Sequence, residues 1–273
     1  MAKLKKAEVQ PLVDRLLELY PNAECALHFG SVYQLLVAVA LSAQTTDKSV
    51  NEVTPALFER CPDARAMAQI TEEELQGLIK RIGMYKTKAK NIIKMAQMLV
   101  EKYDGEVPED YDKLVELPGV GRKTANVVLS VGFGHQRIAV DTHVFRLANR
   151  MGFVKETDVL KTELGLMKAV PEENWSALHH ALIWHGRQVC TARNPRCEEC
   201  GAADLCKKNM EPAGGKAAAA KKTAAPTKAA KAVKKEAASK KAAQAVKKEA
   251  APTKAAAKAT KKAAAPTAAL NAE

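Results

Sequence analysis

The aromatic residues of the chain all lie in its first 184 residues, and this limits how much of it can fold. All 12 aromatic residues of the 273 lie at or before Trp184. Residues 213–273 contain 27 Ala, 15 Lys and 3 Glu, so this segment carries the whole net charge of +12. A segment without large apolar side chains cannot offset the entropy lost on ordering. We therefore expect residues 1–212 to fold and residues 213–273 to form a disordered basic tail.

The tail is a low-complexity segment. The heptapeptide AVKKEAA starts at residues 232 and 245, and AAPTKAA starts at residues 224 and 250. Three prolines, Pro226, Pro252 and Pro266, interrupt any helix that its Ala and Lys favour. Two interpretations remain open. The tail is either a solvated linker, or a polycation that binds nucleic acid by counterion release, like the arms of linker histones.

The sequence predicts neither a membrane span nor a secretory signal. The best apolar run, Leu35–Leu41, is far shorter than the roughly 20 residues that a spanning helix needs. The basic start of the chain is not followed by an apolar stretch. We therefore expect a cytoplasmic, nucleoid-associated protein with no membrane partner.

Apolar residues in the first 212 positions recur at intervals of three and four, which predicts an all-α fold of about ten short helices. Ser31 with Gln34, and Thr71 with Glu74, have the spacing of helix N-caps. One buried helical stripe is predicted at Tyr85, Ala89, Ile92, Ile93, Ala96, Leu99 and Tyr103, with Lys86, Lys90 and Lys94 on the opposite face.

Four cysteines form a compact loop with the pattern C-x6-C-x2-C-x5-C: Cys190, Cys197, Cys200 and Cys206. In a reducing compartment, metal ligation is more probable than disulfide formation. Four thiolates suit either a tetrahedral zinc or an iron-sulfur cluster, and the spacing leaves both open. Arg193 and Arg196, between the first two cysteines, either contact a phosphate backbone or neutralise an anionic cluster. Cys25 and Cys61 are predicted to be core thiols.

The segment LPGVGRKTA at residues 117–125 joins two predicted helices through two glycines, and its second helix is expected over Thr124–Val131. It is either a tight turn or a phosphate-binding hairpin, since glycines at a helix start let main-chain N–H groups approach a phosphate. Lys123 lies in the first turn, beside Arg122 and near the positive end of the helix dipole, and both disfavour its protonated form. Lys123 either pairs with phosphate or acts as a nucleophile that forms an imine with a sugar aldehyde.

The segment VDTHVFR at residues 140–146 begins a further predicted helix. Asp141 is either the N-cap of this helix or a carboxylate that stabilises positive charge on a sugar losing its base. His179, His180 and His185 lack the i, i+4 spacing of a helical zinc site, so we interpret them as core residues.

These motifs, together with LSAQTTD at residues 41–47, closely resemble the bacterial endonuclease III family of helix-hairpin-helix DNA glycosylases, from the first helix to about Lys208. The resemblance implies an enzyme that removes oxidised pyrimidines from duplex DNA and cleaves the abasic site by β-elimination. It implies that Lys123 attacks the deoxyribose C1′ and forms a Schiff base, and that Asp141 is the catalytic aspartate. The four loop cysteines would hold a 4Fe-4S cluster.

The same resemblance implies how the protein contacts its partner, double-stranded DNA containing oxidised pyrimidines or abasic sites. Gln44 would fill the space left by the extruded base, and Met84 stands where the family places a leucine wedge. Further contacts are expected at Leu117, Gly119, Val120, Gly121, Arg122, Thr124, His143, Arg146, Arg193 and Arg196. Residues 1–212 contain 28 basic and 28 acidic residues, so DNA affinity must come from a local patch that also includes Lys86, Lys90 and Lys94. We expect a monomer.

The implied fold has two helical lobes. Residues 25–136 would form a six-helix barrel with the hairpin, and residues 1–24 would pack with residues 137–212 in an iron-sulfur cluster lobe, with Lys123 opposite Asp141 across the cleft. The sequence leaves two alternatives open. Adenine-mismatch glycosylases of the same superfamily usually lack the hairpin lysine and carry a folded C-terminal domain. The other alternative is a non-catalytic architectural protein that binds DNA through its tail.

Overall fold

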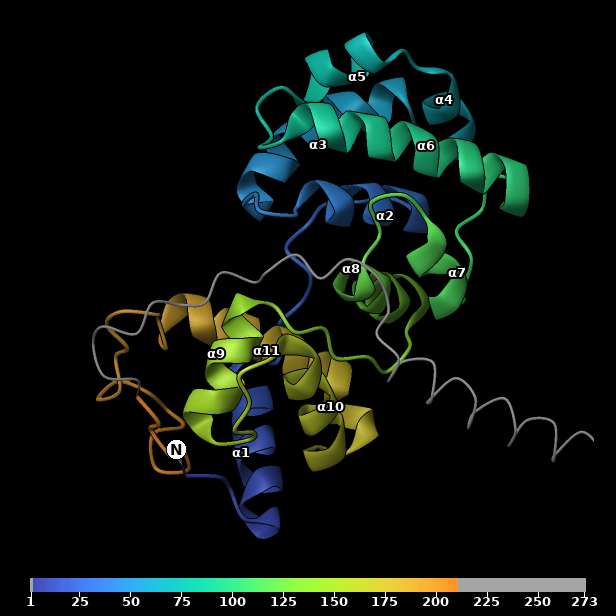
Figure 1. Ribbon diagram of the computed structural model, residues 1–273. Coiled ribbons are helices and arrows are strands. Elements are labelled where there is room, and N and C mark those ends of the chain that lie inside the picture. Colours follow the sequence, from blue (N-terminus) through green and yellow to red (C-terminus); the bar gives the residue numbers. More distant parts are fainter. Residues whose placement is uncertain (1, 211–273) are drawn as a thin grey trace, which may run out of the picture. The chain divides into compact units, whose positions relative to one another are not determined.

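A computed structural model describes residues 2–210 of the chain, and the basic tail at 213–273 lies outside the described residues. The regular secondary structure of residues 2–210 is entirely helical, with no strand, as the apolar spacing predicted (Figure 1). Within this range no helix combines the length and apolar character of a membrane span. The α-helices are α1 (Lys6–Leu19), α2 (Val32–Leu41), α3 (Asp47–Arg60), α4 (Ala64–Gln69), α5 (Glu72–Ile79), α6 (Tyr85–Tyr103), α7 (Tyr111–Glu116), α8 (Arg122–Val127), α9 (Thr142–Met151), α10 (Val159–Ala169) and α11 (Trp175–Gln188).

The first lobe, α2–α8, encloses a hydrophobic core of its own. Its longest helix, α6, buries Ala89, Ile92, Ala96 and Leu99 and half-buries the rest of the predicted stripe, which is therefore confirmed. The predicted caps at Ser31 and Thr71 are also present, since each hydroxyl oxygen accepts the N–H three residues later. The chain between α5 and α6 turns at Gly83.

The helix expected over Thr124–Val131 differs from the sequence prediction. It begins two residues earlier, as α8, and widens at Val128–Gly132 into a π-helical turn. Gly132 faces α2 closely, since a Cβ added there would lie 2.9 Å from Val32 Cγ1. A glycine is therefore needed where this turn packs on α2.

The second lobe combines the start of the chain with its later helices. Buried residues of α1, α9, α10 and α11 form a second core around Leu12, Leu16 and Phe153. The two ends of the described chain are tied together, since Asn209 Nδ2 donates to Ala2 O at 2.7 Å. In Figure 1 this lobe, with α1 beside α9–α11, is separate from the group α2–α8.

A buried carboxylate joins the two lobes. Glu163 on α10 is 4% exposed. It accepts hydrogen bonds from Arg122 Nη2 at 2.6 Å and Nε at 2.9 Å, and from Asn126 Nδ2 at 3.1 Å, both on α8. A second ion pair, between Arg187 on α11 and Asp47 on α3, spans the lobes at 2.6 Å. The hairpin helix is thus fixed to the opposite lobe through charged groups.

We predict that Glu163→Gln lowers the free energy of unfolding by about 2 kcal/mol, because the Arg122 guanidinium loses its charged partner. The cost stays below that of a fully buried pair since Arg122 is partly exposed. Urea denaturation measures this difference. Glu101→Gln, at an exposed position of α6, serves as the matched control. Equal unfolding free energies for the two variants would contradict the assignment.

Candidate active site and DNA-contacting surface

A cavity of about 790 Å³ lies between the two lobes. Lys123, in the first turn of α8, and Asp141, immediately before α9, both line it. The first comes from the hairpin lobe and the second from the lobe of the cysteines. The structure therefore brings together the two groups that the sequence singled out separately, across 18 residues of chain.

The Asp141 carboxylate caps α9. Its Oδ1 accepts the Val144 N–H at 2.8 Å, as the capping interpretation predicted. Capping and chemistry are therefore compatible, because the cap fixes the carboxylate at the cavity wall.

The hairpin between α7 and α8 presents main chain rather than apolar side chains. Leu117 is 2% exposed and Val120 is 6% exposed, and both pack into the first core. The side chains of these two expected DNA contacts therefore face inward. Gly119 and Gly121 are exposed. Gly119 has φ +83° and lies so close to Asn91 that an added Cβ would approach it to 3.1 Å, so only glycine suits this position.

Two further expected contacts, His143 and Arg146, lie on α9 and are half-buried. Arg146 Nη2 donates to Gly186 O at 2.9 Å and to Cys190 O at 3.0 Å, so this guanidinium group is engaged inside the protein. It joins α9 to the end of α11. His143 lines the cavity, and burial lowers its pKa. A Cβ at Gly186 would lie 2.9 Å from His143 Nδ1, so a glycine there allows α11 to approach α9.

His179 and His180 on α11 contribute to the cavity in a way that the sequence did not reveal. His179 is 3% exposed, as expected of a core residue, yet both histidines line the cavity beside Asp141. Burial lowers the pKa of His179 to about 3, so the ring is neutral near pH 7. Its buried Nδ1 has no hydrogen-bond partner within the described part of the chain. Helical spacing identifies a buried face, but only the fold shows that this face meets α9.

Gln44 and Met84 occupy exposed, left-handed backbone positions, with φ of 54° and 56°. Gln44 lines the cavity, and Met84 precedes α6 with 54% of its surface exposed. Left-handed backbone is uncommon for residues other than glycine and marks locally strained segments. The surrounding structure must therefore stabilise the left-handed backbone of both Gln44 and Met84.

The four loop cysteines line a second, smaller cavity. Cys190 Sγ accepts from Arg150 Nη1, and Cys206 Sγ accepts from the Lys208 N–H, both at 3.3 Å. No three His, Cys, Asp or Glu side chains within residues 2–210 are grouped as ligands of a single metal ion. Of the remaining cysteines, Cys61 is buried in the first core as predicted, whereas the half-buried Cys25 lines the cavity of Lys123.

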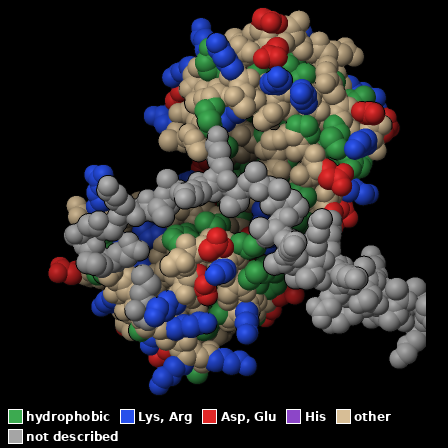
Figure 2. Space-filling view, in the orientation of Figure 1, with side chains coloured by type: hydrophobic (Ala, Val, Ile, Leu, Met, Phe, Trp, Pro, Cys, Tyr) green, Lys and Arg blue, Asp and Glu red, His purple; other side chains and the backbone are tan. Residues whose placement is uncertain are grey.

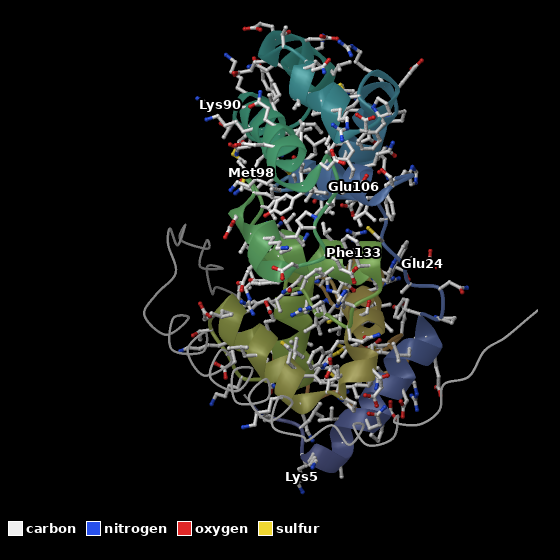
Figure 3. All side chains as sticks on the ribbon, turned by 90° about the vertical axis from the view of Figure 1, so that its right-hand side faces the viewer. Lys5, Glu24, Lys90, Met98, Glu106 and Phe133 are labelled. Carbon is white, nitrogen blue, oxygen red and sulfur yellow. The ribbon has the colours of Figure 1, made fainter. Side chains whose placement is uncertain are left out.

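The expected basic patch is distributed over both lobes. Lys86, Lys90 and Lys94 are exposed on α6, and Lys90 projects away from it (Figure 3). Arg193 is exposed, while Arg196 forms an ion pair with Glu199 at 3.0 Å. Figure 2 shows Lys and Arg side chains interspersed with acidic ones, in keeping with a body that has no net charge.

Residues 37–172 match the family described as "HhH-GPD superfamily base excision DNA repair protein". The chain is 50% identical over 212 residues to an endonuclease III of Bacillus subtilis, covering 77% of this chain and 96% of that protein. It is 48% identical over 203 residues to an endonuclease III of Escherichia coli K12, covering 74% and 96%. The chain belongs to the endonuclease III family of the HhH-GPD superfamily.

A solved structure of this family has a fold similar to that of the chain. It is a trapped endonuclease III–DNA covalent intermediate in an estranged-adenine complex. It matches with a TM-score of 0.72 and 47% identity, over 75% of this chain and 97% of that one. The resemblance and the all-α fold expected from the sequence are confirmed, and membership identifies the chain as a DNA glycosylase of base excision repair.

We predict that the neutral His179 makes stability depend on pH. The folded-state pKa of about 3 lies below the value of about 6.5 in the unfolded chain. The unfolded chain therefore binds the extra proton between these values. The free energy of unfolding should fall by up to about 1.4 kcal/mol per pH unit as the pH is lowered below about 6.5.

Urea denaturation of wild type and His179→Asn at several values between about pH 7 and pH 5 measures this slope. The variant should show a shallower dependence, whereas His28→Asn, at an exposed position, should match the wild type. A slope in His179→Asn as steep as that of the wild type would argue against a neutral buried ring.

Proposed function

We propose that this protein removes oxidised pyrimidines from duplex DNA and cleaves the resulting abasic site as a lyase. The observation that carries the proposal is the shared cavity of Lys123 and Asp141, next to a hairpin with exposed glycines. An amine nucleophile, an anionic carboxylate and a main-chain phosphate site are the groups that this chemistry requires. We further propose that it acts as a monomer on damaged or abasic double-stranded DNA.

The chemistry follows from the two side chains. The damaged nucleotide leaves the base stack and enters the cavity. Lys123 Nζ, as the free amine, attacks C1′, and the electron pair of the glycosidic bond leaves with the base, which takes up a proton. The anionic Asp141 stabilises the positive charge that develops on the sugar. The sugar ring opens to an imine on Lys123.

Strand cleavage then needs only proton transfers and water. Loss of a C2′ proton expels the 3′ phosphate by β-elimination, and hydrolysis of the imine returns the Lys123 amine. The proton on C2′ must pass to a base in the cavity, and Asp141 lies on the cavity wall. The adenine-mismatch alternative is less compatible with this arrangement, because those relatives usually lack the lysine on which it depends.

For the second cavity we propose a 4Fe-4S cluster held by Cys190, Cys197, Cys200 and Cys206. Four thiolates suit either a structural zinc or an iron-sulfur cluster, and membership of the endonuclease III family favours the cluster. A cubic cluster gives each thiolate a separate iron, so its sulfurs stand apart around one centre. When bound, the cluster would staple the loop that carries Arg193 and Arg196.

We predict that Lys123→Gln abolishes both strand cleavage and borohydride trapping on abasic DNA, because glutamine cannot form an imine. Denaturing gel electrophoresis of labelled DNA measures both products. Lys48→Gln is the matched control, since Lys48 is an exposed lysine that lines the same cavity. It should still yield the covalent adduct. A Lys123→Gln protein that traps and cleaves like the wild type would refute the mechanism.

We predict that the purified protein contains about four iron and four sulfide per chain and absorbs visible light. Cys197→Ser should reduce both contents and bleach the absorbance. Cys61 is buried in the core of the first lobe, whereas the cysteine loop belongs to the second lobe. Cys61→Ala should therefore leave the cluster intact. Colourless protein that contains zinc after anaerobic purification would exclude the iron-sulfur assignment.

A further inference from the structure

Lys88 on α6 is a buried lysine with no part in the chemistry described above. Its residue is 7% exposed, and its Nζ donates to Leu41 O at 2.8 Å and to Thr45 Oγ1 at 2.9 Å. Lysine is almost never this buried unless it is paired. Burial lowers the pKa of the Lys88 ammonium, so the two acceptors must compensate part of a real desolvation cost.

The acceptors of Lys88 flank Gln44. Leu41 ends α2, and Thr45 lies two residues before α3, so both belong to the segment that carries Gln44. The main-chain N–H of Lys88 donates to Met84 O at 3.0 Å. One residue is therefore bonded through its side chain to the segment of Gln44 and through its main chain to Met84.

The two segments also lie close together. A Cβ added at Gly83 would lie 3.8 Å from both Gln44 O and Thr45 Oγ1, which is ordinary van der Waals contact. The backbone at Gln44 and at Met84 is left-handed. A residue in a strained backbone region persists only where its surroundings fix it. Here the segments that carry Gln44 and Met84 are both hydrogen-bonded to Lys88.

We propose that Lys88 is a positioning residue that holds Gln44 and Met84 as a pair, so that both side chains enter the duplex together when a nucleotide leaves the stack. This inference rests on the proposed function. A polar amide and an apolar thioether, both exposed and carried on neighbouring segments, match a vacated duplex position, which has polar base edges and apolar stacking faces. The pairing fails if either segment shifts, and the Lys88 side chain connects the two.

A positioning role and a merely structural role predict different results. A duplex requires the extruded nucleotide to be replaced, whereas an unpaired strand has no vacated position to fill. Loss of positioning should therefore impair action on duplex DNA selectively. Loss of stability should impair action on both kinds of DNA alike.

The test compares full-length Lys88→Met with wild type on one abasic oligonucleotide, used as a duplex and as the unpaired strand. We expect the cleavage rate on the duplex to fall about tenfold or more, with the rate on the unpaired strand changing less than about twofold. Lys88→Arg should recover part of the duplex rate, since it restores a cationic donor. Lys102→Met, at an exposed position of the same helix, should match the wild type. A parallel loss on both substrates would overturn the inference.

Two further arms keep the outcome decisive. Thr45→Val removes one acceptor of Lys88 and should give a smaller loss in the same direction if Lys88→Met does not fold. In a Lys123→Gln background, 2-aminopurine opposite the abasic site should become more fluorescent on binding, and Lys88→Met should suppress this change. An unchanged signal would refute the positioning role. A wild-type protein that cleaves neither abasic substrate would instead refute the proposed function.

Discussion

The buried carboxylate of Glu163 is the contact on which the arrangement of the site depends. It accepts hydrogen bonds from Arg122, which directly precedes Lys123, and from Asn126, which follows Lys123 by three residues on α8. The proposed nucleophile, Lys123, is therefore carried by a helix that is fixed directly to the opposite lobe. Because an ion pair between Arg187 and Asp47 joins the lobes as well, the cavity is held between charged contacts rather than across a continuous core.

Two separate hydrophobic cores explain why polar groups gather at the junction. Each lobe buries its own apolar residues in its own core. The helices that face the other lobe line the cavity, mostly with polar side chains. Neutral His179 and the capping carboxylate of Asp141 lie there together. In such a partly dehydrated site, a fixed charge acts more strongly on a developing positive charge than it would in water.

Local features of this fold were predictable from the sequence, and long-range ones were not. The stripe on α6, the caps at Ser31 and Thr71, and the capping role of Asp141 depend on residues three or four apart, and periodicity identifies them. The partnership of Glu163 with Arg122 spans 41 residues, and that of Lys88 with Leu41 spans 47. Nothing in the spacing of these residues reveals such contacts. The orientation of Leu117 and Val120 could not be predicted from the sequence either, because the hairpin motif does not indicate which of its side chains are buried.

The most direct test of the account is to identify the residue that bonds to the sugar. The covalent conjugate formed with abasic DNA under borohydride would be digested and its modified peptide sequenced by mass spectrometry. We expect the reduced sugar fragment to be attached to Lys123. Attachment to another amine that borders the cavity, such as Lys48, would contradict it.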